Sequence, residues 1–179
     1  MDMPEKLNEG IDSWNTVMLL YHSALKEVGT KLEILNDEFQ HVHQYNPIEY
    51  IKSRIKTPES IVKKLRRNGY ESTIDNMVNY VNDIAGIRIV CSFTSDIYRM
   101  AVPIFLSDRV VDTKVEIQIR TIAMDFWASL EHKIYYKFEG NAPDYISEDL
   151  KECADIVSML DAKMLSLNKA ILEAKKAEQ

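Results

Sequence analysis

Several features that define common protein classes are scarce in this sequence. Only two of its 179 residues are cysteines, too few for a zinc cluster or a disulfide framework. No apolar run approaches the roughly 20 residues that a membrane-spanning helix needs, and the polar, acidic N-terminus has no signal-peptide pattern. We therefore expect Cys91 and Cys153 to be buried free thiols, and we expect the protein to be cytoplasmic and to have no membrane partner.

Basic charge is also in short supply. The chain has 22 lysines and arginines against 28 aspartates and glutamates, a formal net charge of −6. Binding along a nucleic acid needs a basic surface, so RNA is disfavoured as a partner unless the basic residues cluster. No glycine-rich loop of the P-loop or dinucleotide-binding type is present. An anionic ligand would have to meet a local basic patch.

Two long heptad patterns flank the middle of the chain. Apolar residues recur at alternating steps of four and three over about residues 11–40, and again over about 147–176. Each pattern predicts a long helix. Either the two helices pack on each other within one subunit, or part of each apolar seam contacts another subunit. We expect both, and hence a homo-oligomer.

Residues of about 46–138 show an α/β pattern between these helices. Pro58 follows Thr57 at a helix start, and Gly69 is a normal C-terminal stop for the short basic helix between them. The apolar run 84–93 predicts a buried strand.

The spacing of apolar residues changes within the stretch 114–137, KVEIQIRTIAMDFWASLEHKIYYK. Apolar residues first alternate with Glu116, Gln118 and Arg120, which places these polar side chains on one face of a strand. Thr121 can then cap a helix whose apolar residues recur every fourth position. The whole chain, 1–179, is predicted to be a single α/β (α+β mixed) domain with a central mixed, mostly antiparallel sheet flanked by helices.

The junction of Met100 and Ala101 is improbable. A short helix beginning at Ser95 would join a strand-like run, 101–106, without a turn residue. The polar residues 107–112 could then form a hairpin turn. The junction indicates a segment missing between Met100 and Ala101.

Charged residues beside the apolar strands are the candidates for chemistry. Asp83 precedes the strand at 84–93, where a carboxylate suits Mg²⁺, although a turn or capping role is the ordinary alternative. Arg88 lies inside this apolar strand, where a guanidinium needs a partner or a ligand. If Glu116 and Arg120 lie on a neighbouring strand, two carboxylates and two arginines share one sheet face. That arrangement would suit metal-assisted phosphoryl chemistry.

A basic set lies in and after the stretch Ile48–Ile55, whose apolar residues alternate loosely. In an acidic chain it favours an anion site, with an ordinary solvated helix face as the alternative. His132 could reach a phosphate or be solvated. The basic set consists of Arg54, Lys56, Lys63, Lys64, Arg66 and Arg67.

Three stretches of the sequence resemble a known family. SRIKTPESIVKKL, DIAGIRIVCSF and VEIQIRTIAMDFWASLEHKIYYK are similar to the synthetase domain of the RelA/SpoT homologues, in the stand-alone small alarmone synthetase form (RelP and RelQ type, closer to RelP). The resemblance extends from about Asn46 to Phe138. It implies a nucleotidyltransferase-like synthetase fold and a homotetramer formed through the terminal helices.

The activity implied by the resemblance is that of a GTP diphosphokinase (pyrophosphokinase). The family transfers the β,γ-diphosphate of ATP to the ribose 3′-hydroxyl of GDP or GTP. The products are AMP and (p)ppGpp, the alarmone of the stringent response. The alternative is a non-catalytic oligomeric nucleotide-binding or regulatory module of the same fold.

The resemblance also implies roles for individual residues. Mg²⁺ would be held by Asp83 and Glu116, and Glu116 would be the general base. The ATP-binding residues would be Arg54 and Arg88 at the adenine, with Lys56, Ser60 and Lys64 at the phosphates. Asp125 would contact the guanine of the acceptor nucleotide, which would also meet Gln118, Arg120 and His132.

One departure from the family coincides with the improbable junction. Family members carry a further strand and a loop with a YIK…NGYRSLH-like motif, whose tyrosine stacks on guanine, and this segment is absent between Met100 and Ala101. If the protein lacks the segment, acceptor binding and activity should be lost. The other possibility is that the protein carries a mobile loop that the 179 residues omit. An intact mass near 20.7 kDa would exclude that second possibility.

Overall fold

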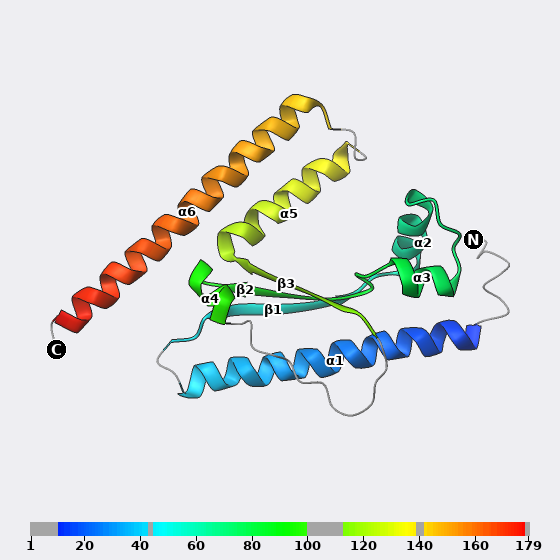
Figure 1. The fold of residues 1–179 in the computed structure, drawn as a ribbon, viewed down its shortest axis with the longest axis horizontal. Helices are drawn as coiled ribbons and strands as arrows, with labels where there is room; N and C mark the ends of the chain where they lie inside the picture. The colour runs from blue at the N-terminus through cyan, green and yellow to red at the C-terminus, as the bar shows by residue number, and fades with distance from the viewer. Residues whose placement is uncertain (1–10, 43–44, 100–112, 139–141, 178–179) are drawn as a thin grey trace. The chain divides into compact units, whose positions relative to one another are not determined.

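The computed structural model describes residues 11–42, 45–99, 113–138 and 142–177 (Figure 1). The predicted strand at 101–106 and turn at 107–112 lie outside these residues. Contacts group the chain into two compact units, which are described separately. The first unit comprises Met1–Val42, Ile51–Arg88 and Pro103–Gln118, and the second comprises His43–Tyr50, Ile89–Val102 and Ile119–Gln179.

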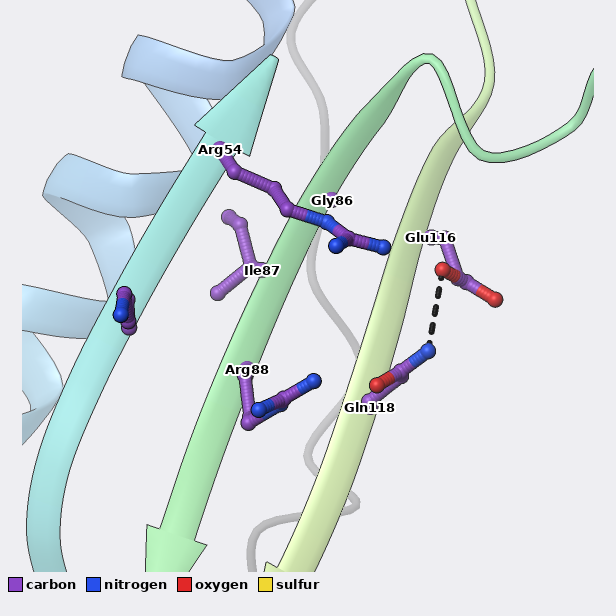
Figure 2. Close-up of a pocket in the computed structure, with 7 residues that line it drawn as sticks. Arg54, Gly86, Ile87, Arg88, Glu116 and Gln118 are labelled. Carbon is purple, nitrogen blue, oxygen red and sulfur yellow. Dashed lines mark hydrogen bonds between the residues drawn. The ribbon is translucent and has the colours of Figure 1, made fainter. Parts of the chain in front are cut away.

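Among the residues that the structure describes, three strands form one sheet in the order β1-β2-β3. They are β1 (Ile48–Ile55), β2 (Ala85–Cys91) and β3 (Val115–Thr121). Figure 2 shows β1 running opposite to β2, whereas β2 and β3 run in the same direction. The predicted mixed α/β fold with a central sheet flanked by helices is therefore confirmed. Of the two neighbouring strand pairs, one is antiparallel.

Helix α1 (Ile11–Val42) belongs to the first unit and runs along its strands (Figure 1). Tyr21, Leu25, Val28 and Leu32 are buried along one side of this helix. Their steps of four, three and four match the predicted seam. The periodicity thus identified which side of α1 is covered, because a side chain every 3.5 residues stays on one face.

Helices α2 (Pro58–Arg67) and α3 (Ile74–Tyr80) pack against each other in the same unit. Thr57 caps α2 by accepting a hydrogen bond from the Ser60 backbone N–H at 3.4 Å. Gly69 ends α2 with φ of 78°, and the Tyr70 N–H donates to the Leu65 carbonyl at 2.9 Å. The helix start and stop predicted from sequence are both present.

Replacing Gly69 or Gly29 by alanine is expected to change the free energy of unfolding in opposite directions. Gly69→Ala is expected to lower the free energy of unfolding by about 1 kcal/mol, since a Cβ strains the left-handed backbone. Gly29→Ala is expected to raise it by about 0.5–1 kcal/mol, because Gly29 is inside α1 and a Cβ there meets nothing within 4 Å. Urea unfolding monitored by circular dichroism measures both changes. A stabilising Gly69→Ala would contradict the assigned cap.

The second unit contains α4 (Thr94–Arg99), α5 (Ile122–Lys137) and α6 (Asp144–Ala177), with α6 packed on both α4 and α5. Thr121 joins two of these elements. Its hydroxyl accepts from the Met124 N–H at 3.1 Å, which caps α5, and donates to Oδ2 of the buried Asp161 on α6 at 2.6 Å. The predicted cap is confirmed, and α6 is anchored where β3 becomes α5.

Much of the predicted seam on α6 is exposed within this chain. The exposed fractions of Leu160, Met164 and Ile171 are 50%, 45% and 55%. Cys91 is buried as predicted, but Cys153, on α6, is exposed within this chain, so the prediction of a buried thiol there was wrong. Among the helices of the described residues, none is long and apolar enough to cross a membrane.

Candidate active site

A pocket of about 120 Å³ lies on the polar face of the sheet, within the first unit (Figure 2). Its wall is drawn from all three strands. The lining residues are Lys52, Arg54, Gly86, Ile87, Arg88, Glu116 and Gln118. Four of the residues singled out from sequence therefore meet here: two arginines, Glu116 and Gln118.

Strand alternation explains why these side chains share a face. Each strand contributes two polar-face positions that are two residues apart, because successive side chains point to opposite sides of a sheet. Figure 2 shows Arg54 extending across β2 over Gly86 toward Glu116. A Cβ on Gly86 would lie 3.8 Å from Arg54 Cγ and 3.9 Å from the Glu116 carbonyl oxygen, which are ordinary contacts. A side chain at position 86 would therefore occupy part of the pocket beneath Arg54, although the backbone of Gly86 is not strained.

The charges around the pocket favour an anionic ligand. Lys52, Arg54 and Arg88 supply three positive charges against the one carboxylate of Glu116. Glu116 Oε2 accepts a hydrogen bond from Gln118 Nε2 at 3.1 Å, which orients the carboxylate. Sequence reasoning missed Lys52. Its signal was the two-residue spacing from Arg54 in a loosely alternating stretch.

Asp83 lies beside a second group of cations in the same unit. Its two carboxylate oxygens accept hydrogen bonds from Lys56 Nζ at 2.5 Å and from Lys64 Nζ at 2.8 Å. Burial alone would raise the pKa of Asp83, but the hydrogen bonds and charges of the two lysines outweigh it and lower the pKa below its usual value. The structure thus brings three predicted site residues together as one ion-pair cluster.

The lowered pKa of Asp83 predicts a pH-dependent loss of stability. A carboxyl with a lowered folded-state pKa contributes stability above its unfolded pKa of about 3.9 and loses it as pH falls through the folded pKa. Wild-type protein should therefore lose more stability between about pH 5 and 3 than Asp83→Asn does. Urea midpoints across this range measure the difference, with exposed Asp155→Asn on α6 as control. Parallel curves for wild type and Asp83→Asn would contradict the assigned ion pairs.

Asp125 is the centre of a polar cluster in the second unit. It lies in the first turn of α5 and is only 8% exposed. Oδ2 accepts from the Tyr50 hydroxyl on β1 at 2.5 Å, and Oδ1 accepts from Arg120 Nη1 on β3 at 3.4 Å. The structure brings together Arg120 and Asp125, which were each expected at the acceptor nucleotide, and it adds Tyr50, which carried no periodic or charge signal.

The remaining predicted residues lie in more open places. Ser60 is exposed in the first turn of α2, and His132 is exposed on α5. Lys63, Arg66 and Arg67 are each partly or fully exposed, in keeping with a solvated helix face. Across residues 11–42, 45–99, 113–138 and 142–177, no group of three or more His, Cys, Asp or Glu could hold a metal ion by itself. A metal here would depend on one or two carboxylates together with ligand oxygens and water.

The fold and the charged pocket define an α/β protein whose sheet carries a pocket suited to an anion, and comparison with known proteins identifies the family. A family model described as "Region found in RelA / SpoT proteins" matches residues 53–110 and 100–141. GTP pyrophosphokinase YwaC of Bacillus subtilis (strain 168) is 41% identical over 201 residues, covering 93% of this chain and 96% of the relative. The chain belongs to the RelA/SpoT family, as its motifs predicted.

Solved structures show the same similarity. The small alarmone synthetase 2 from Bacillus subtilis matches with a TM-score of 0.73 at 40% identity, covering 88% of this chain and 98% of the other. The small alarmone synthetase 1 bound to AMPCPP matches with a TM-score of 0.71 at 30% identity, and the same enzyme bound to its product pppGpp matches with 0.75 at 27%. Both alignments cover 90% of this chain and 99% of the other.

The length of the alignment with YwaC exceeds the length of the chain. It has 201 positions, whereas 93% of 179 residues is about 166, so about 35 positions of the relative have no counterpart here. The family model matches in two pieces that overlap at residues 100–110. Both observations are consistent with a segment missing at the junction of Met100 and Ala101.

Proposed function

We propose that this chain is a GTP/GDP pyrophosphokinase that makes (p)ppGpp and AMP from ATP and a guanine nucleotide, within a single synthetase domain. The observation that carries the proposal is the pocket where Arg54, Arg88 and Glu116 meet on one sheet face. Its support is the relatives: YwaC is named a GTP pyrophosphokinase, and small alarmone synthetase 1 has been solved with AMPCPP and with pppGpp.

The donor nucleotide would use the basic residues of the first unit. The guanidinium planes of Arg54 and Arg88 suit stacking on the two faces of adenine. Lys56, Lys64 and the Ser60 hydroxyl suit the triphosphate, because transfer of a diphosphate requires neutralisation of charge on its oxygens. Lys52, at the pocket wall, adds a further cation.

Glu116 would act as the general base. It accepts the proton of the 3′-hydroxyl while the 3′ oxygen forms a bond to the β-phosphorus, and the bond from that phosphorus to the oxygen bridging to the α-phosphorus breaks. AMP leaves with that oxygen. The acceptor would be held by Gln118, Arg120, Asp125 and His132, with the Asp125 carboxylate accepting from the N1 and N2 donors of guanine. The base contributes about 10²–10⁴-fold, the usual range for such catalysis.

Mg²⁺ fits the donor set that the chain offers. Asp83 and Glu116 provide hard carboxylate oxygens, and the phosphates of the substrate and water would complete the coordination. When bound, the ion supplies further charge neutralisation on the diphosphate. Asp83 now accepts from Lys56 and Lys64, so these lysines are already near the place where phosphate oxygens would arrive.

We also propose that the protein is a cytoplasmic homotetramer assembled through its terminal helices. The support is the apolar seam on α6, where side chains such as Leu160, Leu167 and Ile171 are about half exposed in the single chain. Burying such a continuous apolar stripe stabilises association. Light scattering measures the mass of the assembly; a monomer near 20.7 kDa would contradict the proposal.

The activity is tested by incubating the protein with ATP, GDP and Mg²⁺. The proposal predicts AMP and a 3′-diphosphorylated guanine nucleotide in equal amounts, and no AMP when GDP is omitted. Release of ADP and inorganic phosphate instead would contradict it.

A second candidate is a nucleotide-binding or regulatory module without turnover. The specific observation that favours it is the gap of about 35 positions against YwaC, since we propose that the gap falls between Met100 and Ala101, where the family carries its acceptor loop. This candidate predicts that AMPCPP binds but that no AMP forms from ATP and GDP. An intact mass near 20.7 kDa would establish that the protein lacks the segment.

A further inference from the structure

Tyr50, which bonds Asp125 in the second unit, has no role in the proposed function so far. Tyr50 is 44% exposed, yet its hydroxyl donates to Asp125 Oδ2 at 2.5 Å. Nearly half of the side chain is therefore exposed, while its hydroxyl donates to a carboxylate that is only 8% exposed. Hydrogen bonds from a hydroxyl to an ionised oxygen at this length are among the stronger ones in proteins.

We propose that Tyr50 is a positioning residue for guanine recognition: it fixes the plane of the Asp125 carboxylate so that this group can accept two parallel hydrogen bonds from the base. This inference rests on the proposed function. Guanine presents two neighbouring N–H donors, at N1 and at the 2-amino group. A carboxylate can match both donors at once only if its plane is held.

The hydrogen bonds of Asp125 support a role for Tyr50 in orienting the carboxylate that would contact the base. Tyr50 holds one oxygen and Arg120 the other, at 2.5 Å and 3.4 Å. A carboxylate has about four lone-pair sites, so accepting from these two side chains is compatible with accepting from a base as well. Of these two contacts the one from Tyr50 is the shorter, so its loss is expected to perturb the carboxylate more than loss of the contact from Arg120.

The position of Asp125 also favours an ordered carboxylate. It lies in the first turn of α5, where the helix dipole stabilises negative charge, and Thr121 caps that helix. The backbone beneath the carboxylate is thus fixed by α5, and the Tyr50 hydroxyl restrains rotation of the Asp125 side chain.

The test is the affinity of Tyr50→Phe for GDP and for inosine diphosphate, measured by calorimetry in the presence of Mg²⁺. Phenylalanine keeps the exposed ring and removes only the donor. GDP affinity is expected to fall about 10-fold, as for loss of a hydrogen bond to a charged group. The preference for GDP over inosine diphosphate, which lacks the 2-amino donor, is expected to shrink, while AMPCPP affinity stays unchanged.

The chain offers a matched control in the same unit. The Tyr45 hydroxyl donates to Asp96 Oδ2, also at 2.5 Å, and Asp96 is 1% exposed, so Tyr45→Phe removes an equivalent bond elsewhere. It is expected to lower the melting temperature without changing GDP affinity or the preference between the two acceptors.

The outcomes separate the inference from the proposed function. Equal GDP affinity and equal acceptor preference in wild type and Tyr50→Phe would overturn the inference alone. Parallel losses of GDP and AMPCPP affinity, or a GDP loss in Tyr45→Phe as large as in Tyr50→Phe, would also overturn it, because the role would then be structural. A wild-type protein that binds AMPCPP but not GDP would overturn both the inference and the proposed acceptor site.

Discussion

Glu116→Gln is expected to lower the rate of diphosphate transfer from ATP to GDP by about 10²–10⁴-fold. Glutamine keeps the shape of the side chain but cannot accept the proton of the 3′-hydroxyl. The Gln118 amide that now donates to Glu116 at 3.1 Å can still donate to the amide oxygen, so the local packing should be retained. The rate is measured as AMP formed per minute under saturating ATP and GDP.

Two comparisons make the Glu116 result specific. Glu33→Gln, on the exposed side of α1, removes an equal charge outside the pocket and is expected to leave the rate unchanged. AMPCPP affinity of Glu116→Gln without added metal should remain within about threefold of wild type, because the substitution makes the pocket more positive rather than less. A Glu116→Gln rate equal to that of wild type would remove Glu116 from the mechanism.

Arg54→Met is expected to weaken AMPCPP binding by about 10- to 100-fold. Stacking of a guanidinium or aromatic plane on a base contributes about 1–3 kcal/mol, and methionine retains length and apolar contact but loses the planar cation. Equilibrium dialysis with labelled AMPCPP measures the change, and it requires no turnover. The result therefore tests the donor pocket even if the chain does not catalyse transfer.

Arg67→Met provides the matched control for Arg54→Met. Arg67 is exposed in the last turn of α2 and does not line the pocket. The same loss of charge and the same new side chain at this place should change AMPCPP affinity by less than about twofold, since exposed charges interact weakly at physiological salt. Equal losses in the two variants would mean that the basic residues act through overall charge, not through stacking in the pocket.

Periodicity predicted the parts of the fold that depend on one face being covered. The seam of Tyr21, Leu25 and Leu32 is buried on α1, and alternation in β3 placed Glu116 and Gln118 on the pocket face. Both patterns are local, because they arise from the geometry of a helix or a strand. The cap at Thr121 and the stop at Gly69 were equally local, since the first depends on a hydroxyl that reaches an N–H three residues on and the second on the left-handed backbone of one glycine.

Pairings between residues far apart in the chain could not be predicted. Tyr50 and Asp125 are 75 positions apart, and nothing in either neighbourhood indicates that their side chains meet. Asp83 was expected at a metal, but its pairing with Lys56 and Lys64 appears only when the end of β1, α2 and the residue before β2 are assembled. Cys153 shows the opposite error: its helical pattern indicated a covered face, and pattern alone does not say whether the cover belongs to the same chain.

The most direct test of the central claim is to follow the β-phosphorus of the donor. ATP labelled at that phosphorus is incubated with GDP, Mg²⁺ and the protein, and the nucleotides are separated. Transfer of an intact diphosphate predicts label in the guanine nucleotide, with unlabelled AMP formed in equal amount. Label found in ADP, or remaining entirely in ATP while AMPCPP binds the pocket, would contradict the assignment of this chain as a pyrophosphokinase.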